Sequence, residues 1–196
     1  MTMQVDPKMQ LLVGRADFAL PDVVEANAGA STIVTEVAIS TLTLGALTIA
    51  AQPDYPRNLR VFITDANSTV TGGTVTVVGQ DQNGEPITEV FTLSTAAAAT
   101  TITGTLAFSK VVSATWALVG GTVTASDDTV AIGIGAAMGL AAAPGAVYQR
   151  LIKATFYGGD EAGTFSATYG TYTPAGTLNG AKPLEVLFHY KLPLKW

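Results

Sequence analysis

Residues 52–67 read QPDYPRNLRVFITDAN, and this stretch decides the fold class. Pro53 and Pro56 each hold φ near about −65° and favour extended geometry in the residue before them, which sets the direction in which the following segment starts. That segment alternates along an extended chain, with one face made of Leu59, Val61 and Ile63 and the other of Arg60, Phe62 and Thr64. Alternation with a period of two predicts a half-buried antiparallel strand.

The same alternation recurs along the chain. It places Val75 and Val77 inward in GTVTVVG, Val130, Ile132 and Ile134 on one face of TVAIGIG, and Leu184, Val186, Phe188, Tyr190 and Leu192 on one face of LEVLFHYKL. Turns are expected at the dipeptides Gly72-Gly73, Asn83-Gly84, Gly120-Gly121, Gly158-Gly159 and Asn179-Gly180. The second of these predicts a hairpin with a loop of about four to six residues. The fold class is therefore all-β, an antiparallel β-sandwich.

The organisation predicted from this pattern is a short arm followed by a single domain. Residues 1–30 show no sustained period of two or of 3.6, and we expect an extended N-terminal arm there. Residues 31–196 form the single sandwich domain. The alanine-rich stretches 95–100 and 135–145 are too short for a stable helix, so we expect loops at both.

Composition narrows the possible functions. The chain has 196 residues, no cysteine, only 13% charged residues and a net charge of −5. The lack of cysteine excludes disulfides, thiolate metal sites and cysteine catalysis, and the negative charge argues against nucleic-acid binding. No apolar run suggests a membrane span, and we expect no secretory signal. So little charge suits a subunit packed against neighbours.

The segment just before the predicted strand, residues 55–58, contains the first candidate interface residues. Arg57 offers a rigid fork of donors for a carboxylate or for carbonyls, and Asn58 can bond backbone groups where the strand starts. Tyr55 offers a large contact area at low entropic cost. These side chains either build a tight loop within the domain or contact a neighbouring subunit. The C-terminal Trp196 either anchors in a neighbour or folds back on its own sandwich.

No catalytic, cofactor or metal site is predicted. His189, the single histidine, falls on the polar face of its strand, and no serine lies in a nucleophile elbow. The acidic pairs Asp127-Asp128 and Asp160-Glu161 lack the spacing of a calcium loop, so we expect solvated turns. We therefore expect a protein that is not an enzyme.

Aromatic residues leave a second function open. Tyr169 and Tyr172, together with Trp116 or Trp196, could form a platform on which a sugar ring stacks. The alternative is that these side chains belong to the core or to an interface, and Tyr172 is accordingly included among the candidate interface residues.

Residues 52–94 resemble a group of tailed-bacteriophage virion proteins. The shared features are the step Pro56-Arg57-Asn58, VTGGTV at 70–75, GQDQNG at 79–84 and TEVF at 88–91. Residues 108–135 and 170–190 are similar to later segments of the same group, so the resemblance covers about 45–190. Most members are capsid decoration or cement proteins.

The resemblance implies a jelly-roll or related sandwich on the outside of an icosahedral head. The expected function is that of a non-enzymatic cement protein, made in the host cytoplasm and located on the capsid exterior. The expected partners are the major capsid protein and further copies of the chain, as a dimer or trimer. The alternatives are a glycan- or receptor-binding module of a tail or fibre, and a head-completion or tail-tube subunit.

Overall fold

The computed structural model describes residues 9–21, 33–39, 44–94, 99–123, 128–142, 146–156 and 159–193. Over these ranges the chain forms strands β1 to β14 and no helix, and every strand pairing is antiparallel. The prediction of an all-β, antiparallel fold is confirmed. Within the same ranges there is no helical segment with the length and hydropathy of a membrane span.

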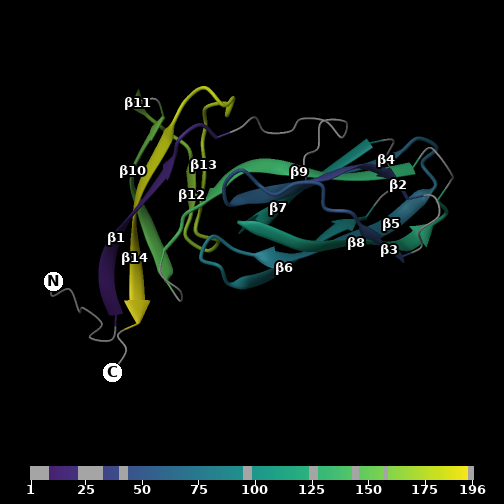
Figure 1. Ribbon diagram of the computed structural model, residues 1–196, viewed down its shortest axis with the longest axis horizontal. Coiled ribbons are helices and arrows are strands. Elements are labelled where there is room, and N and C mark those ends of the chain that lie inside the picture. Colours follow the sequence, from purple (N-terminus) through teal and green to yellow (C-terminus); the bar gives the residue numbers. More distant parts are fainter. Residues whose placement is uncertain are drawn as a thin grey trace.

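Two sheets form a sandwich, seen as the two layers on the right of Figure 1. The first, which we call the β4 sheet, has the order β12-β13-β9-β4-β7, and β2 pairs with part of β9. Its strands are β2 (Val34–Ala38), β4 (Arg57–Asp65), β7 (Ala99–Phe108), β9 (Asp128–Gly139), β12 (Thr164–Ser166) and β13 (Thr171–Thr173). The second, the β5 sheet, has the order β3-β8-β5-β6 and consists of β3 (Leu44–Leu47), β5 (Val70–Gln80), β6 (Pro86–Leu93) and β8 (Lys110–Gly121).

The larger hydrophobic core lies between these two sheets. The faces predicted from the alternation are confirmed, because the buried side chains include Leu59, Val61, Ile63, Val75, Val77, Val130, Ile132 and Ile134. Among the residues that the structure describes, Trp116 of β8 is the largest fully buried side chain. Burial of this apolar surface is the main favourable term in folding, at about 25 cal/mol per Å².

A third sheet, the terminal sheet, covers one end of the sandwich. It has the order β1-β14-β10-β11 and consists of β1 (Met9–Phe18), β10 (Val147–Phe156), β11 (Gly159–Asp160) and β14 (Leu184–Pro193). Its strands run across the direction of the sandwich strands (Figure 1). Its inner face, with Leu184, Val186 and Phe188, packs with Met138 and Tyr172 in a second core.

The terminal sheet includes part of the segment for which we expected an extended arm. Met9–Phe18 forms β1 and pairs with β14 along its whole length, from Met9 opposite Pro193 to Phe18 opposite Leu184. Phe18 and the half-buried Ala16 belong to the second core. Residues 1–8 and 22–30 lie outside the described ranges.

Of three predicted loops and turns, one is confirmed and two are wrong in whole or in part. The Asn83-Gly84 hairpin is confirmed, because β5 and β6 pair directly and residues 81–85 connect them. The loop expected at 135–145 is wrong for its first part, since β9 continues through Gly139 and pairs there with β13. The turn expected at Gly72-Gly73 is also wrong, since both glycines lie inside β5.

Candidate interaction surfaces

The loop before β4 joins the sandwich to the terminal sheet. The hydroxyl oxygen of Tyr55 accepts a hydrogen bond from the backbone N–H of Ala19 at 3.2 Å, and its ring meets Phe18 edge-on at 5.4 Å. Arg57 is fully buried at the start of β4, and its Nη1 donates to the Asp54 carboxylate at 3.1 Å. The structure thus gives both Tyr55 and Arg57 partners within the chain.

Asn58 connects two irregular strands. Residues 135–137 of β9 all lie opposite Asn58, and residues 104–106 of β7 all lie opposite Leu59, so both neighbours of β4 carry extra residues at this level. The Nδ2 of Asn58 donates to the Gly104 carbonyl at 2.8 Å, and its Oδ1 accepts from the Ala137 N–H at 2.9 Å. The buried amide therefore bonds backbone groups that the interrupted ladders leave unmatched.

Glu89 of β6, which the sequence analysis did not identify, bonds the same irregular part of β7 from the other sheet. Its Oε1 accepts from the Thr105 N–H at 2.6 Å and from the Leu106 N–H at 3.4 Å. A carboxylate on β6 thus bonds the extra residues of β7 and links the edges of the two sandwich sheets. The alternation predicts an inward position for residue 89, but nothing local indicates partners 16 and 17 residues away.

Two of the remaining aromatic candidates lie inside the cores. Tyr172 and Trp116 are fully buried, each in a different core. The Tyr172 hydroxyl accepts from the Gly163 N–H at 2.8 Å and donates to the Glu161 carbonyl at 3.3 Å. Tyr169 is 41% exposed, and Trp196 lies outside the described residues. Tyr172 and Trp116 therefore offer no surface on which a sugar could stack.

His189 and the described residues of the acidic pairs do not come together in a catalytic or metal site. His189 Nδ1 accepts from Arg150 Nε at 3.0 Å on the outer face of the terminal sheet. Asp160 pairs with Lys153 at 3.0 Å. Asp128 is fully buried in β9, so the solvated turn expected there is wrong for this residue. The described residues contain no group of three side chains placed to hold a metal ion.

Tyr148 of β10 fixes the junction between the hairpin loop 81–85 and the second core. Its hydroxyl donates to the Leu140 carbonyl and lies 3.4 Å from both Gln82 Nε2 and Asn83 Nδ2. Asn83 Oδ1 accepts from the Ala142 N–H at 2.7 Å. Burial raises the pKa of Tyr148 above its ordinary value, an effect that the two amide donors partly oppose.

This raised pKa predicts a loss of stability at alkaline pH. Tyrosine in the unfolded chain ionises near pH 10, so at higher pH the unfolded state loses its proton first and unfolding becomes more favourable. The contribution is fully present below about pH 10 and is lost as the pH rises through the higher native pKa. Burial raises the pKa of Tyr172 as well, so its contribution has the same sign.

Denaturant unfolding measured from pH 8 to pH 11 tests this prediction. The free energy of unfolding should fall more steeply above pH 10 in the wild type than in Tyr148→Phe. The comparison uses the slope of the unfolding free energy against pH and not its absolute value, because Tyr148→Phe also removes hydrogen bonds at neutral pH. Tyr169→Phe, which removes an exposed phenol, is the matched control, and equal slopes for wild type and Tyr148→Phe would contradict the prediction.

The outer face of the β5 sheet carries no charge over three successive rows of side chains. Cross-strand register places Thr76 beside Thr115 and Val90, and the neighbouring rows continue the pattern. We call this surface the threonine face. Its members are Ala46, Thr74, Thr76, Val78, Thr88, Val90, Thr92, Ser113, Thr115 and Ala117. Beyond Val78 the next outward residue of β5 is Gln80, and the charged Lys110 lies opposite it, at the end of the threonine face.

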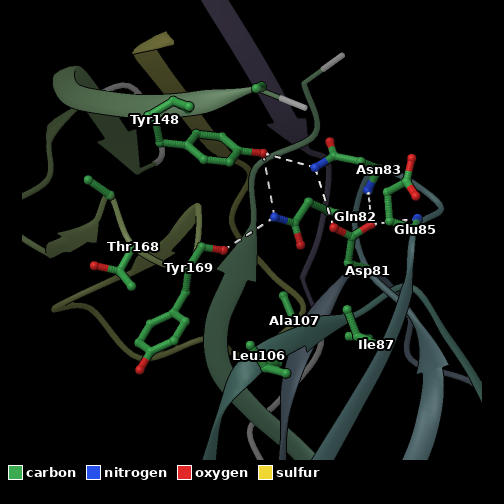
Figure 2. A pocket seen from close by; sticks show the side chains of 13 residues that line it. Asp81, Gln82, Asn83, Glu85, Ile87, Leu106, Ala107, Tyr148, Thr168 and Tyr169 are labelled. Carbon is green, nitrogen blue, oxygen red and sulfur yellow. Dashed lines mark hydrogen bonds between the residues drawn. The ribbon is translucent and has the colours of Figure 1, made fainter. Parts of the chain in front are cut away.

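A groove of about 460 Å³ lies where the hairpin loop 81–85 approaches the turn before β13. Figure 2 shows Tyr169 on one side of it and Asp81 with Ile87 on the other. Gln82 crosses its inner end, because its Nε2 lies 3.4 Å from the Tyr148 hydroxyl and 3.3 Å from the Tyr169 carbonyl oxygen. The apolar part of its wall consists of Ile87, Leu106 and Ala107.

Sequence alternation predicts which threonines point outward on each strand, but the rows of the threonine face and the groove depend on strand register. The described residues place Arg57, Asn58 and Tyr172 inside the chain and pack Tyr55 against the second core. They leave the threonine face and the groove as exposed features. Comparison of the chain with family models, with curated proteins and with solved structures found no match.

Proposed function

We propose that this protein is a non-enzymatic structural subunit of a bacteriophage virion, a cement protein that binds the outside of an icosahedral head across capsid subunits. The observation that carries the proposal is the threonine face, a surface of exposed and half-buried side chains without charge on a chain that bears a net charge of −5. The resemblance of residues 45–190 to virion proteins gives the proposal its biological setting.

The chemistry of the threonine face suits a contact between proteins. Covering it requires no charged group to leave water, which is the largest cost of burying a protein surface. Protein interfaces are depleted in charged residues at their centre for this reason. The hydroxyl groups bond water when the face is free and bond a partner when it is covered, so the face is compatible with both states.

The size of the threonine face indicates that one contact is weak. Three strands about 4.8 Å apart, each contributing about five residues with a rise of about 3.3 Å, give about 240 Å², to which β3 adds only Ala46. A stable pair of proteins covers about 800 Å² on each partner. Cementing therefore needs several contacts for each copy, whose modest free energies combine through a high effective concentration.

The terminal sheet supplies a second exposed surface for such contacts. Val13 of β1 is 62% exposed, and Leu11, Val147 and Ile152 are also exposed on this sheet. Because this sheet lies at the end of the sandwich, one copy has apolar surface at two separate places (Figure 1). Each copy can then touch two neighbours, either capsid proteins or further copies as a dimer or trimer.

Co-sedimentation with purified empty heads of the virus that encodes the chain tests the proposal. Wild-type protein should sediment with the heads, and the double variant Thr76→Lys/Val90→Lys should bind at least about tenfold more weakly, because each lysine would be buried without a partner. Thr101→Lys/Thr103→Lys is the control, since it adds the same charge to exposed positions of β7. Wild-type protein that ignores the heads, or lysine variants that bind at full strength, would overturn the proposal.

A further inference from the structure

We propose that the groove between the hairpin loop 81–85 and Tyr169 receives an arginine side chain from a partner protein. This names a chemistry of recognition for the partner in the proposed function, and it rests on that function only in assuming that the partner is a protein. The groove is about 460 Å³, within the range of about 300–1,000 Å³ that small-ligand sites occupy.

The charge of the groove favours a cation. Two carboxylates, Asp81 and Glu85, line it, and no lysine or arginine is among its lining residues in the described chain. The backbone amides of Asn83 and Glu85 donate to Asp81 Oδ1 at 2.7 and 2.9 Å. Those bonds fix the carboxylate in place, while Oδ2 has one long contact, with Asn83 Nδ2 at 3.5 Å.

Glu85 supplies the second negative charge with few competing contacts. Its side chain is exposed, and within the described part of the chain no ion pair involves its carboxylate. The two acidic side chains lie on the same five-residue hairpin loop, whose conformation Gly84 permits through its φ of 82°. A planar guanidinium can bond either carboxylate with its fork of donors.

The other walls of the groove match the rest of an arginine side chain. Tyr169 is 41% exposed and lines the groove on the side opposite Asp81 (Figure 2), so its ring offers an aromatic surface to a side chain that enters the groove. Ile87, Leu106 and Ala107 give an apolar wall along which the methylene stem can lie. A groove lined by carboxylates, an aromatic ring and an apolar wall fits arginine better than a neutral sugar, which has no charge to satisfy.

The test uses N-acetyl-arginine amide as a probe and follows backbone amide shifts of the full chain by NMR. We expect saturable shifts in residues 81–85 and 167–170, with millimolar affinity that weakens as salt rises. N-acetyl-citrulline amide has the same shape without the charge and should bind at least about threefold more weakly. N-acetyl-lysine amide should lie between them, since it lacks the planar fork.

Variants assign the effect to the groove. Glu85→Gln and Tyr169→Ala should each weaken arginine-amide binding about two- to fivefold, the size expected for an exposed ion pair and a surface cation–π contact. Asp160→Asn removes the same charge from β11 and is the matched control. Equal binding of the citrulline probe, unchanged affinity in Glu85→Gln, or preferential binding of methyl glycosides in the same groove would each overturn the inference. Because no heads are present, these outcomes are independent of the test of cementing.

Discussion

Replacing Asn58 by alanine is expected to destabilise the protein by about 2–5 kcal/mol, the cost of leaving two buried backbone groups without a partner. Asn58 is almost fully buried, and its amide bonds the Gly104 carbonyl at 2.8 Å and the Ala137 N–H at 2.9 Å. Both partners lie where the strand ladder is interrupted, so no neighbouring strand can bond them instead. Denaturant unfolding at neutral pH measures the change.

Asn179→Ala is the control for this prediction. Asn179 is exposed and its Oδ1 accepts one hydrogen bond, from the Ala181 N–H at 3.1 Å in a surface turn. Its loss should cost less than about 1 kcal/mol, because water replaces the lost partner. Equal effects of the two substitutions would show that Asn58 contributes nothing beyond an ordinary surface asparagine.

Asn58→Asp separates the loss of one bond from the loss of both. A carboxylate keeps the acceptor for the Ala137 N–H but places a second oxygen where Asn58 Nδ2 now donates to Gly104. At neutral pH this buried charge should destabilise at least as much as alanine does. At acid pH a protonated carboxyl can donate to the Gly104 carbonyl, so the deficit relative to wild type at the same pH should shrink. Asn58→Ala has no side-chain group that could form this hydrogen bond, so its deficit should not shrink at acid pH.

The parts of the fold that were predictable from the sequence are those set by neighbouring residues. Alternation along a single strand gave the inward faces around Leu59, Val75, Ile132 and Phe188, because side chains of an extended chain point to opposite faces in turn. The β5–β6 hairpin was also predictable, since Asn83-Gly84 joins two such runs and glycine tolerates the positive φ found there.

The parts that were not predictable depend on residues far apart in the chain. The partners of Asn58 lie 46 and 79 residues away, and β1 pairs with β14 at the other end of the chain. Residues 9–18 alone do not distinguish an extended arm from a strand, because the partner strand lies far away in the sequence. The loop predicted for the alanine-rich stretch is wrong for a related reason, because β9 continues through it by pairing with β13 on one side and with β4 on the other.

The glycine pair at 72 and 73 shows how a rule based on neighbouring residues predicted a turn where the structure has a strand. Two adjacent glycines usually favour a turn, yet neither has a positive φ and both lie in β5. A Cβ on Gly73 would lie 2.1 Å from Cη2 and 2.7 Å from Cζ3 of the Trp116 indole. Gly73 is therefore required by close packing against the largest buried side chain of the sandwich core.

Gly73→Ala is expected to destabilise the protein by about 1–3 kcal/mol or more, because the buried indole has to shift to accommodate the added methyl group. Gly72→Ala is the matched control: the same change one residue earlier meets nothing closer than 3.6 Å. That variant should be neutral or gain up to about 1 kcal/mol, since alanine reduces the entropy of the unfolded chain. Denaturant unfolding of both variants, with indole fluorescence as one probe, gives the comparison.

A double-mutant cycle shows whether the indole is the cause. Trp116→Phe removes the outer ring atoms that a Cβ at position 73 would strike, and by itself it leaves a cavity that should cost about 1–3 kcal/mol. In its presence Gly73→Ala meets open space, so the double variant should be at least about 1 kcal/mol more stable than the sum of the single effects predicts. Strict additivity would mean that strain in the backbone of β5, and not contact with Trp116, makes glycine necessary at position 73.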